Sequence, residues 1–158
     1  MIYIYPEQFD CDGKKTTTTS SYVMLGGRKV KMVLQRKPWE CGAACVCMLL
    51  DYYGKCISLA QACFECNATD GGQSAGDLMR AVKRLGLTCH GYNISVNELR
   101  KFKAPLIIYC YANHFMILDR IQDDDVYIVD PAGGNKRISF AELQQIYSGI
   151  VLMMDDPT

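Results

Sequence analysis

Apolar and polar positions divide this chain into a helical first half and a strand-rich second half. The run over 41–50 is uncharged and mostly apolar, and the pattern predicts a helix from Cys41 to Tyr53 that ends at Gly54. Serines followed by helix-start patterns predict further helices at 58–66, 74–85, 95–102 and from 139 onward.

Short apolar runs bounded by turn residues follow from position 87 onward. They predict strands at 87–92, 106–111, 114–121, 126–130 and 149–154. The almost wholly apolar run over 106–111 is expected at the centre of a sheet. Alternating basic and apolar residues over 28–34 predict a short lead-in strand, and 137–138 predicts an edge. Because the helices precede the strands, we expect an α+β fold with a mostly antiparallel sheet.

The composition narrows the class of protein. The 158 residues suffice for one domain with a buried core, which we place at 29–158, behind a flexible, partly Thr-rich extension over 1–28. Seventeen basic and seventeen acidic residues cancel, and no basic patch is interleaved with aromatics, so no nucleic acid is expected as a partner. No apolar run is long enough to cross a bilayer and no secretory signal opens the chain, so we expect a cytoplasmic protein.

Nine cysteines are many for this length, and their number is odd. Without an export signal, reduced thiols are the expected state. Cys63 and Cys66 have the spacing of zinc ligands, but a second tight pair is missing, and the only histidines, His90 and His114, are not in a zinc-finger arrangement. We therefore expect no metal and no cofactor, with a zinc-binding module as an alternative.

Cys41 stands in the first turn of the predicted helix. There the unpaired backbone N–H groups and the helix dipole favour a thiolate, which is the reactive form of cysteine. The alternative is a small core residue like Cys45 and Met48, which lie on a similar face of the helix. Other residues of the sequence are needed to distinguish a nucleophilic Cys41 from a Cys41 that is only part of the core.

A nucleophilic cysteine needs a base, a group that orients the base, and donors for the oxyanion. His114 begins one predicted strand and Asp130 ends the next. A hairpin that turns at 122–125 brings both to the same end, where the acid can fix the tautomer of the imidazole. Gln35, six residues before Cys41, can point an amide donor at the same place. The alternatives are a hydrogen-bonded histidine, an aspartate of the following turn and a solvated glutamine.

The order of these residues along the chain is that of papain-type peptidases. It is a glutamine, a cysteine at a helix start, a histidine at a strand start and an acid on the next strand. Closer similarity lies in three stretches, which are Gln35 with Glu40-Cys41-Gly42-Ala43-Ala44-Cys45, Asn113-His114-Phe115 and Asp130-Pro131-Ala132-Gly133. They resemble the peptidase domain of bacteriocin- and lanthipeptide-processing ABC transporters, a papain-like cysteine peptidase that cuts leader peptides after a double glycine. The likeness extends from about Val30 to Met154.

This resemblance implies roles for four residues. Cys41 would be the nucleophile, and His114 the general base and later the acid. Asp130 would be the orienting acid, and the Gln35 amide an oxyanion donor beside the backbone N–H of Cys41. The fold would be papain-like, with the nucleophile at a helix start in a helical part packed on the sheet.

The resemblance also implies a substrate and partners. The substrate would be a ribosomally made precursor peptide whose leader is cut after Gly-Gly or Gly-Ala, coupled to export. The rest of the leader would bind as an amphipathic helix in a shallow groove. The family usually continues into transmembrane helices and an ATPase domain, and neither follows here, so we expect an excised domain or a stand-alone peptidase. Transporter parts would be partners at the cytoplasmic face of the membrane.

Other functions stay open at this point. One is a non-catalytic papain-like domain that binds leader peptide and regulates a transporter. Another is a different Cys–His enzyme, such as an acyltransferase or an amidase. Met24-Leu25-Gly26-Gly27 also suggests self-cleavage after Gly27, against the simpler interpretation of a flexible joint before the first strand.

Overall fold

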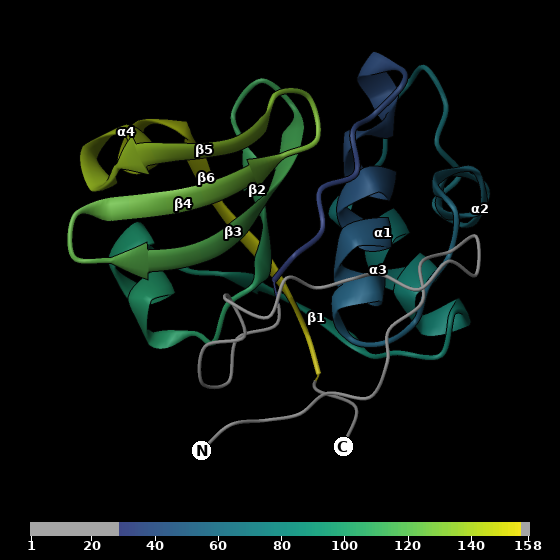
Figure 1. The fold of residues 1–158 in the computed structure, drawn as a ribbon, viewed down its shortest axis with the longest axis horizontal. Coiled ribbons are helices and arrows are strands. Elements are labelled where there is room, and N and C mark those ends of the chain that lie inside the picture. Colours follow the sequence, from purple (N-terminus) through teal and green to yellow (C-terminus); the bar gives the residue numbers. More distant parts are fainter. Residues whose placement is uncertain (1–28, 156–158) are drawn as a thin grey trace.

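Helices and strands form two layers in the computed structural model of the protein, which describes residues 29–155. Helices α1, α2 and α3 gather on one side and the sheet stands on the other (Figure 1). The three helices are α1 (Cys41–Tyr52), α2 (Leu59–Glu65) and α3 (Ala75–Arg84). The predicted extension over 1–28, with Gly26-Gly27, lies outside the described residues.

Helix α1 is the centre of the helical layer. Every residue from 41 to 50 is buried, because the sheet, α2 and α3 surround this helix. The helix ends where the sequence predicts, since Gly54 adopts the left-handed conformation with φ of +91°. There the N–H of Lys55 bonds to the carbonyl of Leu50 at 2.7 Å.

Helices α2 and α3 begin at the predicted serines. The Ser58 hydroxyl accepts the N–H of Gln61 at 3.1 Å. Ser74 and Asp77 form a reciprocal capping box, with N···O distances of 3.1 and 2.9 Å. The prediction at 95–102 is only partly right, because the segment forms the 3-10 helix η3 (Val96–Lys101) with no side-chain cap bond.

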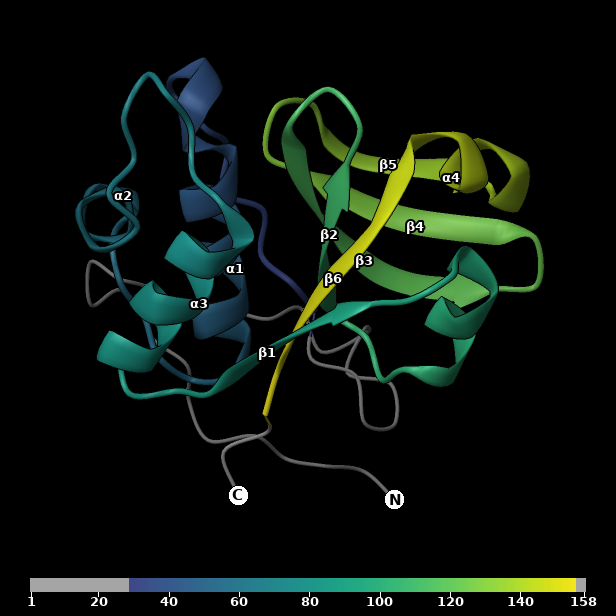
Figure 2. The ribbon, with the colours of Figure 1, turned by 180° about the vertical axis from the view of Figure 1, so that it is seen from behind.

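The sheet has six antiparallel strands in the order β1-β6-β2-β3-β4-β5. Their bounds are β1 (Cys89–Asn93), β2 (Leu106–Cys110), β3 (His114–Gln122), β4 (Asp125–Asp130), β5 (Gly134–Ser139) and β6 (Tyr147–Met154). Helix α4 (Phe140–Ile146) connects β5 to β6. In Figure 2 the long strand β6 crosses in front of β2, and β1 runs from the helical layer towards it. Central β2 is largely buried, as its apolar sequence predicts.

Two predictions about strands are corrected. The described part of the lead-in segment, 29–34, is not a strand. It leads into Gln35, whose backbone N–H bonds to the carbonyl of Pro131 in a loop, at 2.9 Å, and not to a strand of the sheet. The edge strand β5 is longer than the predicted 137–138, because it pairs with β4 along its whole length.

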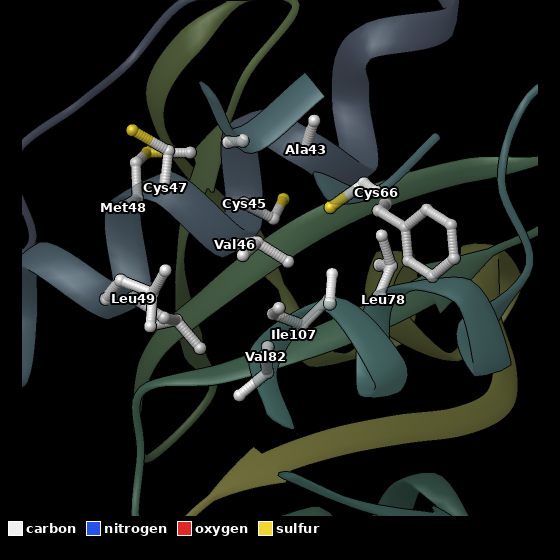
Figure 3. Packing of buried hydrophobic residues seen from close by; sticks show 14 of the residues in the cluster. Ala43, Cys45, Val46, Cys47, Met48, Leu49, Cys66, Leu78, Val82 and Ile107 are labelled. Carbon is white, nitrogen blue, oxygen red and sulfur yellow. The ribbon is translucent and has the colours of Figure 1, made fainter. Parts of the chain in front are cut away.

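Apolar side chains pack on both faces of the sheet. On the helical face, Phe115 and Ile117 of β3 and Ile107 of β2 pack with residues of α1 and α3. Figure 3 shows this core, with Val46 of α1 close to Ile107 of β2. Burying one such side chain contributes about 1.5–3 kcal/mol to folding. The packing therefore holds α1 firmly against β3, and both elements carry residues of the predicted site at their first positions.

The opposite face of the sheet has its own apolar cluster. Leu99 of η3, Leu143 of α4 and Tyr147 of β6 cover strand residues such as Met116 and Ile128. No helix within residues 29–155 is long and apolar enough to cross a membrane.

The cysteines serve mainly in packing. Seven of those in residues 29–155 are free, and Cys56 is in a disulfide, so the expectation of reduced thiols throughout is wrong at Cys56. Cys66 is fully buried in the helical core, and the Cys63 thiol donates to a carboxylate oxygen of Glu40 at 3.3 Å. No group of three metal-binding side chains occurs in the described part of the chain.

Candidate active site

Three of the four predicted residues lie at the junction of the two layers. Cys41 is the first residue of α1 and only 6% exposed. His114 begins β3 and Asp130 ends β4. The β3–β4 hairpin pairs Ile117 with Val129, which leaves His114 and Asp130 at one end of the sheet.

The imidazole of His114 is held by Asp130. Its Nε2 lies 2.7 Å from Oδ1 of Asp130, which confirms the proximity predicted from the hairpin. The same oxygen accepts the N–H of Ala132 at 2.9 Å, and Oδ2 accepts the ammonium of Lys136 at 3.1 Å. Burial alone would raise the pKa of the Asp130 carboxyl, but these three donors lower it below its usual value. The carboxylate therefore stays ionised and fixes the ring.

Cys41 and His114 shift each other's pKa. Burial would raise the pKa of the Cys41 thiol, but the His114 side chain and the Phe115 backbone N–H lower it overall. The Cys41 side chain is the largest cause of a raised pKa of His114, and Asp130 adds to it against the effect of burial. Both shifts favour a thiolate–imidazolium pair. Since Nε2 bonds to Asp130, Nδ1 is the ring nitrogen left for sulfur.

Gly42 lets α3 approach the cysteine closely. A Cβ at this position would lie 2.9 Å from Cδ2 of Leu78 and 3.2 Å from Oε1 of Gln73. Carbon atoms do not approach this closely in proteins, so only glycine fits without displacing the buried Leu78 side chain. The residue after Cys41 therefore sets the distance between the first turn of α1 and the start of α3.

A tight turn sets the direction of His114. Ala112 and Asn113 both have left-handed backbones, with φ of 72° and 57°. The Asn113 side-chain oxygen accepts the Tyr109 hydroxyl at 2.6 Å, and the Tyr109 ring packs on Phe115 with centroids 4.6 Å apart. The turn is thereby tied to the strands on both sides of it.

Gln35 lies in a loop that is tied to the Asp130 turn through the bond to Pro131. Its side-chain Nε2 donates to the carbonyls of Lys37 and Pro38, at 3.2 and 3.5 Å. Its Oε1 is buried and has no hydrogen-bond partner among the described residues. The structure thus brings the backbone of Gln35 to the site, while its amide faces its own loop.

Glu40 organises this loop. Its carboxylate accepts the backbone N–H groups of Arg36 and Lys37 at 2.8 and 2.9 Å, and the Arg36 guanidinium at 3.1 Å. Burial would raise the pKa of Glu40, but these bonds and the one from Cys63 lower it to about 2. The loop before Cys41 is therefore fixed by a buried ionised carboxylate.

Sequence reasoning missed Lys136 and the organising role of Glu40. Lys136 pairs with Ile128 across β4 and β5, two residues from Asp130, so strand alternation puts the lysine on the face of Asp130. A known register would have revealed this contact, but the sequence left the extent of β5 undefined.

The fold, with a cysteine at a helix start and a His–Asp pair on the adjoining strands, defines the class of papain-like cysteine peptidases. Residues 29–158 match the family described as the Peptidase C39 family. The chain belongs to this family of cysteine peptidases, and the predicted fold class is confirmed.

Curated relatives include secretion proteins and proteases. The colicin V secretion/processing ATP-binding protein CvaB of Escherichia coli is 28% identical over 79% of this chain, and the match covers 18% of its own length. The probable functional amyloid protease FapD of Pseudomonas aeruginosa is 33% identical over 78% of this chain and 60% of its own. The chain thus spans less than a fifth of the transporter relative.

Solved structures show the same fold. A double glycine motif protease from an AMS/PCAT transporter, in complex with the leader peptide, is 34% identical with a TM-score of 0.77, over 80% of this chain and 91% of its own. The peptidase domain of Streptococcus ComA, at 20% identity and a TM-score of 0.75, covers 80% of this chain and 98% of its own and supports the fold alone.

Proposed function

We propose that this protein is an endopeptidase that removes the leader from ribosomally made precursor peptides by cutting after Gly-Gly or Gly-Ala. The observation that carries the proposal is the His114–Asp130 hydrogen bond at 2.7 Å together with the opposite pKa shifts of Cys41 and His114, which favour a thiolate. Support for the substrate comes from the neighbouring double glycine motif protease, which was solved with a leader peptide.

In the first step the Cys41 sulfur attacks the carbonyl carbon of the residue before the cut. An S–C bond forms and the carbonyl electrons move to oxygen, which becomes an oxyanion. The backbone N–H of Cys41, at the start of α1, is the first proposed donor for this oxyanion. Gln35 is the second proposed donor; its Nε2 bonds to the carbonyls of Lys37 and Pro38 and would turn towards the oxyanion when substrate binds.

The C–N bond then breaks and leaves a thioester on Cys41. The departing amine takes its proton from the imidazolium of His114, which becomes neutral. A water molecule attacks the thioester and gives a proton to His114. The C–S bond breaks, the leader leaves with a new carboxylate, and the thiolate–imidazolium pair is restored. Asp130 keeps the ring in one orientation through both proton transfers.

Preference for glycine follows from exclusion in this proposal. A narrow cleft beside Cys41 would select its substrate by size. A substrate glycine passes where a Cβ-bearing side chain meets protein atoms. The bulk of the binding free energy then has to come from the leader, through an apolar helical face.

Partners and location are part of the same proposal. The names of the relatives as secretion/processing ATP-binding proteins favour a place at the cytoplasmic side of an exporter. We propose the transmembrane and ATPase parts of such an exporter as partners, with the leader delivered to the peptidase before export.

The test is mass spectrometry of a precursor peptide with a Gly-Gly leader end, incubated with the protein. We expect a cut after the second glycine, lost in Cys41→Ala and retained in Cys89→Ala, a control that removes a buried thiol of β1. A peptide with valine in place of the second glycine should stay intact. Leader binding without cleavage by the wild-type protein would instead support a non-catalytic regulator, and cleavage by Cys41→Ala would contradict the nucleophile.

A further inference from the structure

A fourth residue, Lys136, contacts the group formed by Cys41, His114 and Asp130. The ammonium of Lys136 lies 3.1 Å from Oδ2 of Asp130, while Oδ1 faces the His114 ring at 2.7 Å. The two carboxylate oxygens are thus divided between a histidine and a lysine. The Lys136 side chain is 42% exposed and that of Asp130 is 10% exposed, so the lysine reaches a nearly buried carboxylate from the solvent side.

The backbone makes this contact specific to Lys136 and not to its neighbours. On β5, Lys136 lies opposite Ile128 and therefore on the same face as Asp130, whereas Arg137 lies opposite Tyr127 on the other face. Arg137 makes a loose ion pair with Asp125 instead, at 3.9 Å. The adjacent cations Lys136 and Arg137 of β5 therefore pair with two different acids, Asp130 and Asp125.

We propose that Lys136 is a positioning residue that sets the working pH range of the Cys41–His114 pair through Asp130. Its positive charge offsets part of the field of the Asp130 carboxylate at the imidazole and at the sulfur. It also fixes the rotation of the carboxylate, because Oδ2 is bound and Oδ1 is left to His114. This inference rests on the proposed function only for its biological meaning, since the charge effect acts on the free enzyme.

The other ionisable groups around Asp130 are neutral thiols. Cys45 of α1 and Cys110 of β2 feel the Asp130 charge, and burial is the largest cause that raises both pKa values, that of Cys110 to about 12. Within residues 29–155, Lys136 and His114 are therefore the cationic groups that face Asp130. Removing Lys136 leaves the histidine alone with the full negative charge.

The expected sign follows from Coulomb's law. Without the lysine, the carboxylate stabilises the imidazolium more strongly, so the pKa of His114 rises. The same stronger negative field disfavours the thiolate, so the pKa of Cys41 rises too. We expect both limbs of the pH profile in Lys136→Met to move upward by about half a pH unit, which lowers the rate on the acid limb about threefold.

The test measures alkylation of Cys41 by iodoacetamide against pH, with the modified peptide identified by mass spectrometry. This reaction reports the thiolate directly and needs no peptide substrate. Lys136→Met should shift the profile upward, and Lys136→Arg should restore it because the charge is kept. Arg137→Met removes an equal charge one residue away and should leave the profile in place.

Each outcome decides the matter. An unshifted profile in Lys136→Met, or an equal shift in Arg137→Met, would overturn the role of Lys136. A lower rate at every pH without movement of the limbs would also overturn it, because that is the result of a merely structural contact. A shifted alkylation profile in a protein that does not cut Gly-Gly peptides would uphold Lys136 and overturn the proposed function.

Discussion

Oδ1 of Asp130 accepts two hydrogen bonds at once, from Nε2 of His114 at 2.7 Å and from the N–H of Ala132 at 2.9 Å. The backbone of the turn thus holds the carboxylate oxygen in place independently of the imidazole. The main chain at Ala132 therefore helps to fix the orientation of His114 by holding the carboxylate to which the ring is bonded.

Asp130→Asn tests this arrangement. Every neighbour of the two oxygens is a donor, so an amide must point its NH₂ group at one of them. We expect kcat/KM to fall about a hundredfold or more, as for other substitutions of the orienting acid. The measurement is steady-state kinetics of both Asp130→Asn and a control variant, Asp119→Asn. Asp119 is a half-buried acid elsewhere on β3, and its substitution should leave kcat/KM unchanged. Equal rates for the wild type and Asp130→Asn would exclude the orienting role.

The pH dependence of cleavage should be bell-shaped. In the proposed mechanism the active pair consists of the Cys41 thiolate and the His114 imidazolium. Because the pKa of Cys41 is lowered and that of His114 is raised, the range in which both charges coexist is wider than for isolated side chains. Activity should fall on the acid side as Cys41 is protonated and on the alkaline side as His114 loses its proton. Measurements of kcat/KM from pH 4 to 10 would show this, and a single rising limb would contradict the ion pair.

Glu40 should make the fold sensitive to acid. Its pKa is about 2 in the folded protein, below the ordinary value of 4.5. A lowered pKa contributes stability above the ordinary value, and this contribution is lost as the pH falls towards 2. We expect Glu40→Gln to lower the free energy of unfolding by about 1–3 kcal/mol at pH 7. The difference from wild type should shrink in urea titrations below pH 4.

The matched control for Glu40 is Glu65→Gln. Glu65 accepts the Arg84 side chain at 3.3 Å on the surface, so its loss should cost less than about 1 kcal/mol. If the two variants have the same urea midpoint at pH 7, the loop before Cys41 does not depend on Glu40.

Gly42→Ala should destabilise the protein. The new methyl group meets the buried Leu78 side chain of α3 at 2.9 Å, which has to move, at a cost of about 1–3 kcal/mol. Gly71→Ala is the matched control, because the nearest atom to its added methyl lies 3.8 Å away. Thermal unfolding of both variants checks the expectation, and a Gly42→Ala protein as stable as Gly71→Ala would show that the Leu78 side chain yields freely.

The turn before His114 should tolerate glycine better than alanine. Asn113 has φ of 57°, which costs an alanine about 1–2 kcal/mol and a glycine almost nothing. Both variants lose the bond from the Tyr109 hydroxyl, so the difference between them isolates the backbone. We expect higher kcat/KM for Asn113→Gly than for Asn113→Ala, and equal values would argue that the side chain alone positions His114.

Local signals in the sequence predicted the helix ends well, except at Ser95, whose side chain makes no cap bond. Ser58, Ser74 and Gly54 bound helices because their effects act within one turn of the chain, and the structure confirms each. The proximity of His114 and Asp130 was predictable for the same reason, since one hairpin relates them.

Long-range contacts were not predictable in this way. The segment over 29–34 alternates like a strand, but a strand needs a partner, and this segment has no place in the sheet. The contacts of Lys136 and of the Glu40 carboxylate depend on strand register and on loop folding, which sequence periodicity does not specify. The extension over 1–28 lies outside the described residues and stays a prediction.

The placement of the reactive sulfur has a consequence for synthesis of the chain. Cys41 leaves the ribosome early, whereas β3 and β4, which carry the groups that perturb its pKa, emerge much later. Until those strands dock on α1, the thiol has the reactivity of an ordinary cysteine. With Cys41 as the proposed nucleophile, a nascent or misfolded molecule lacks the activated thiolate, and completion of folding switches the peptidase on.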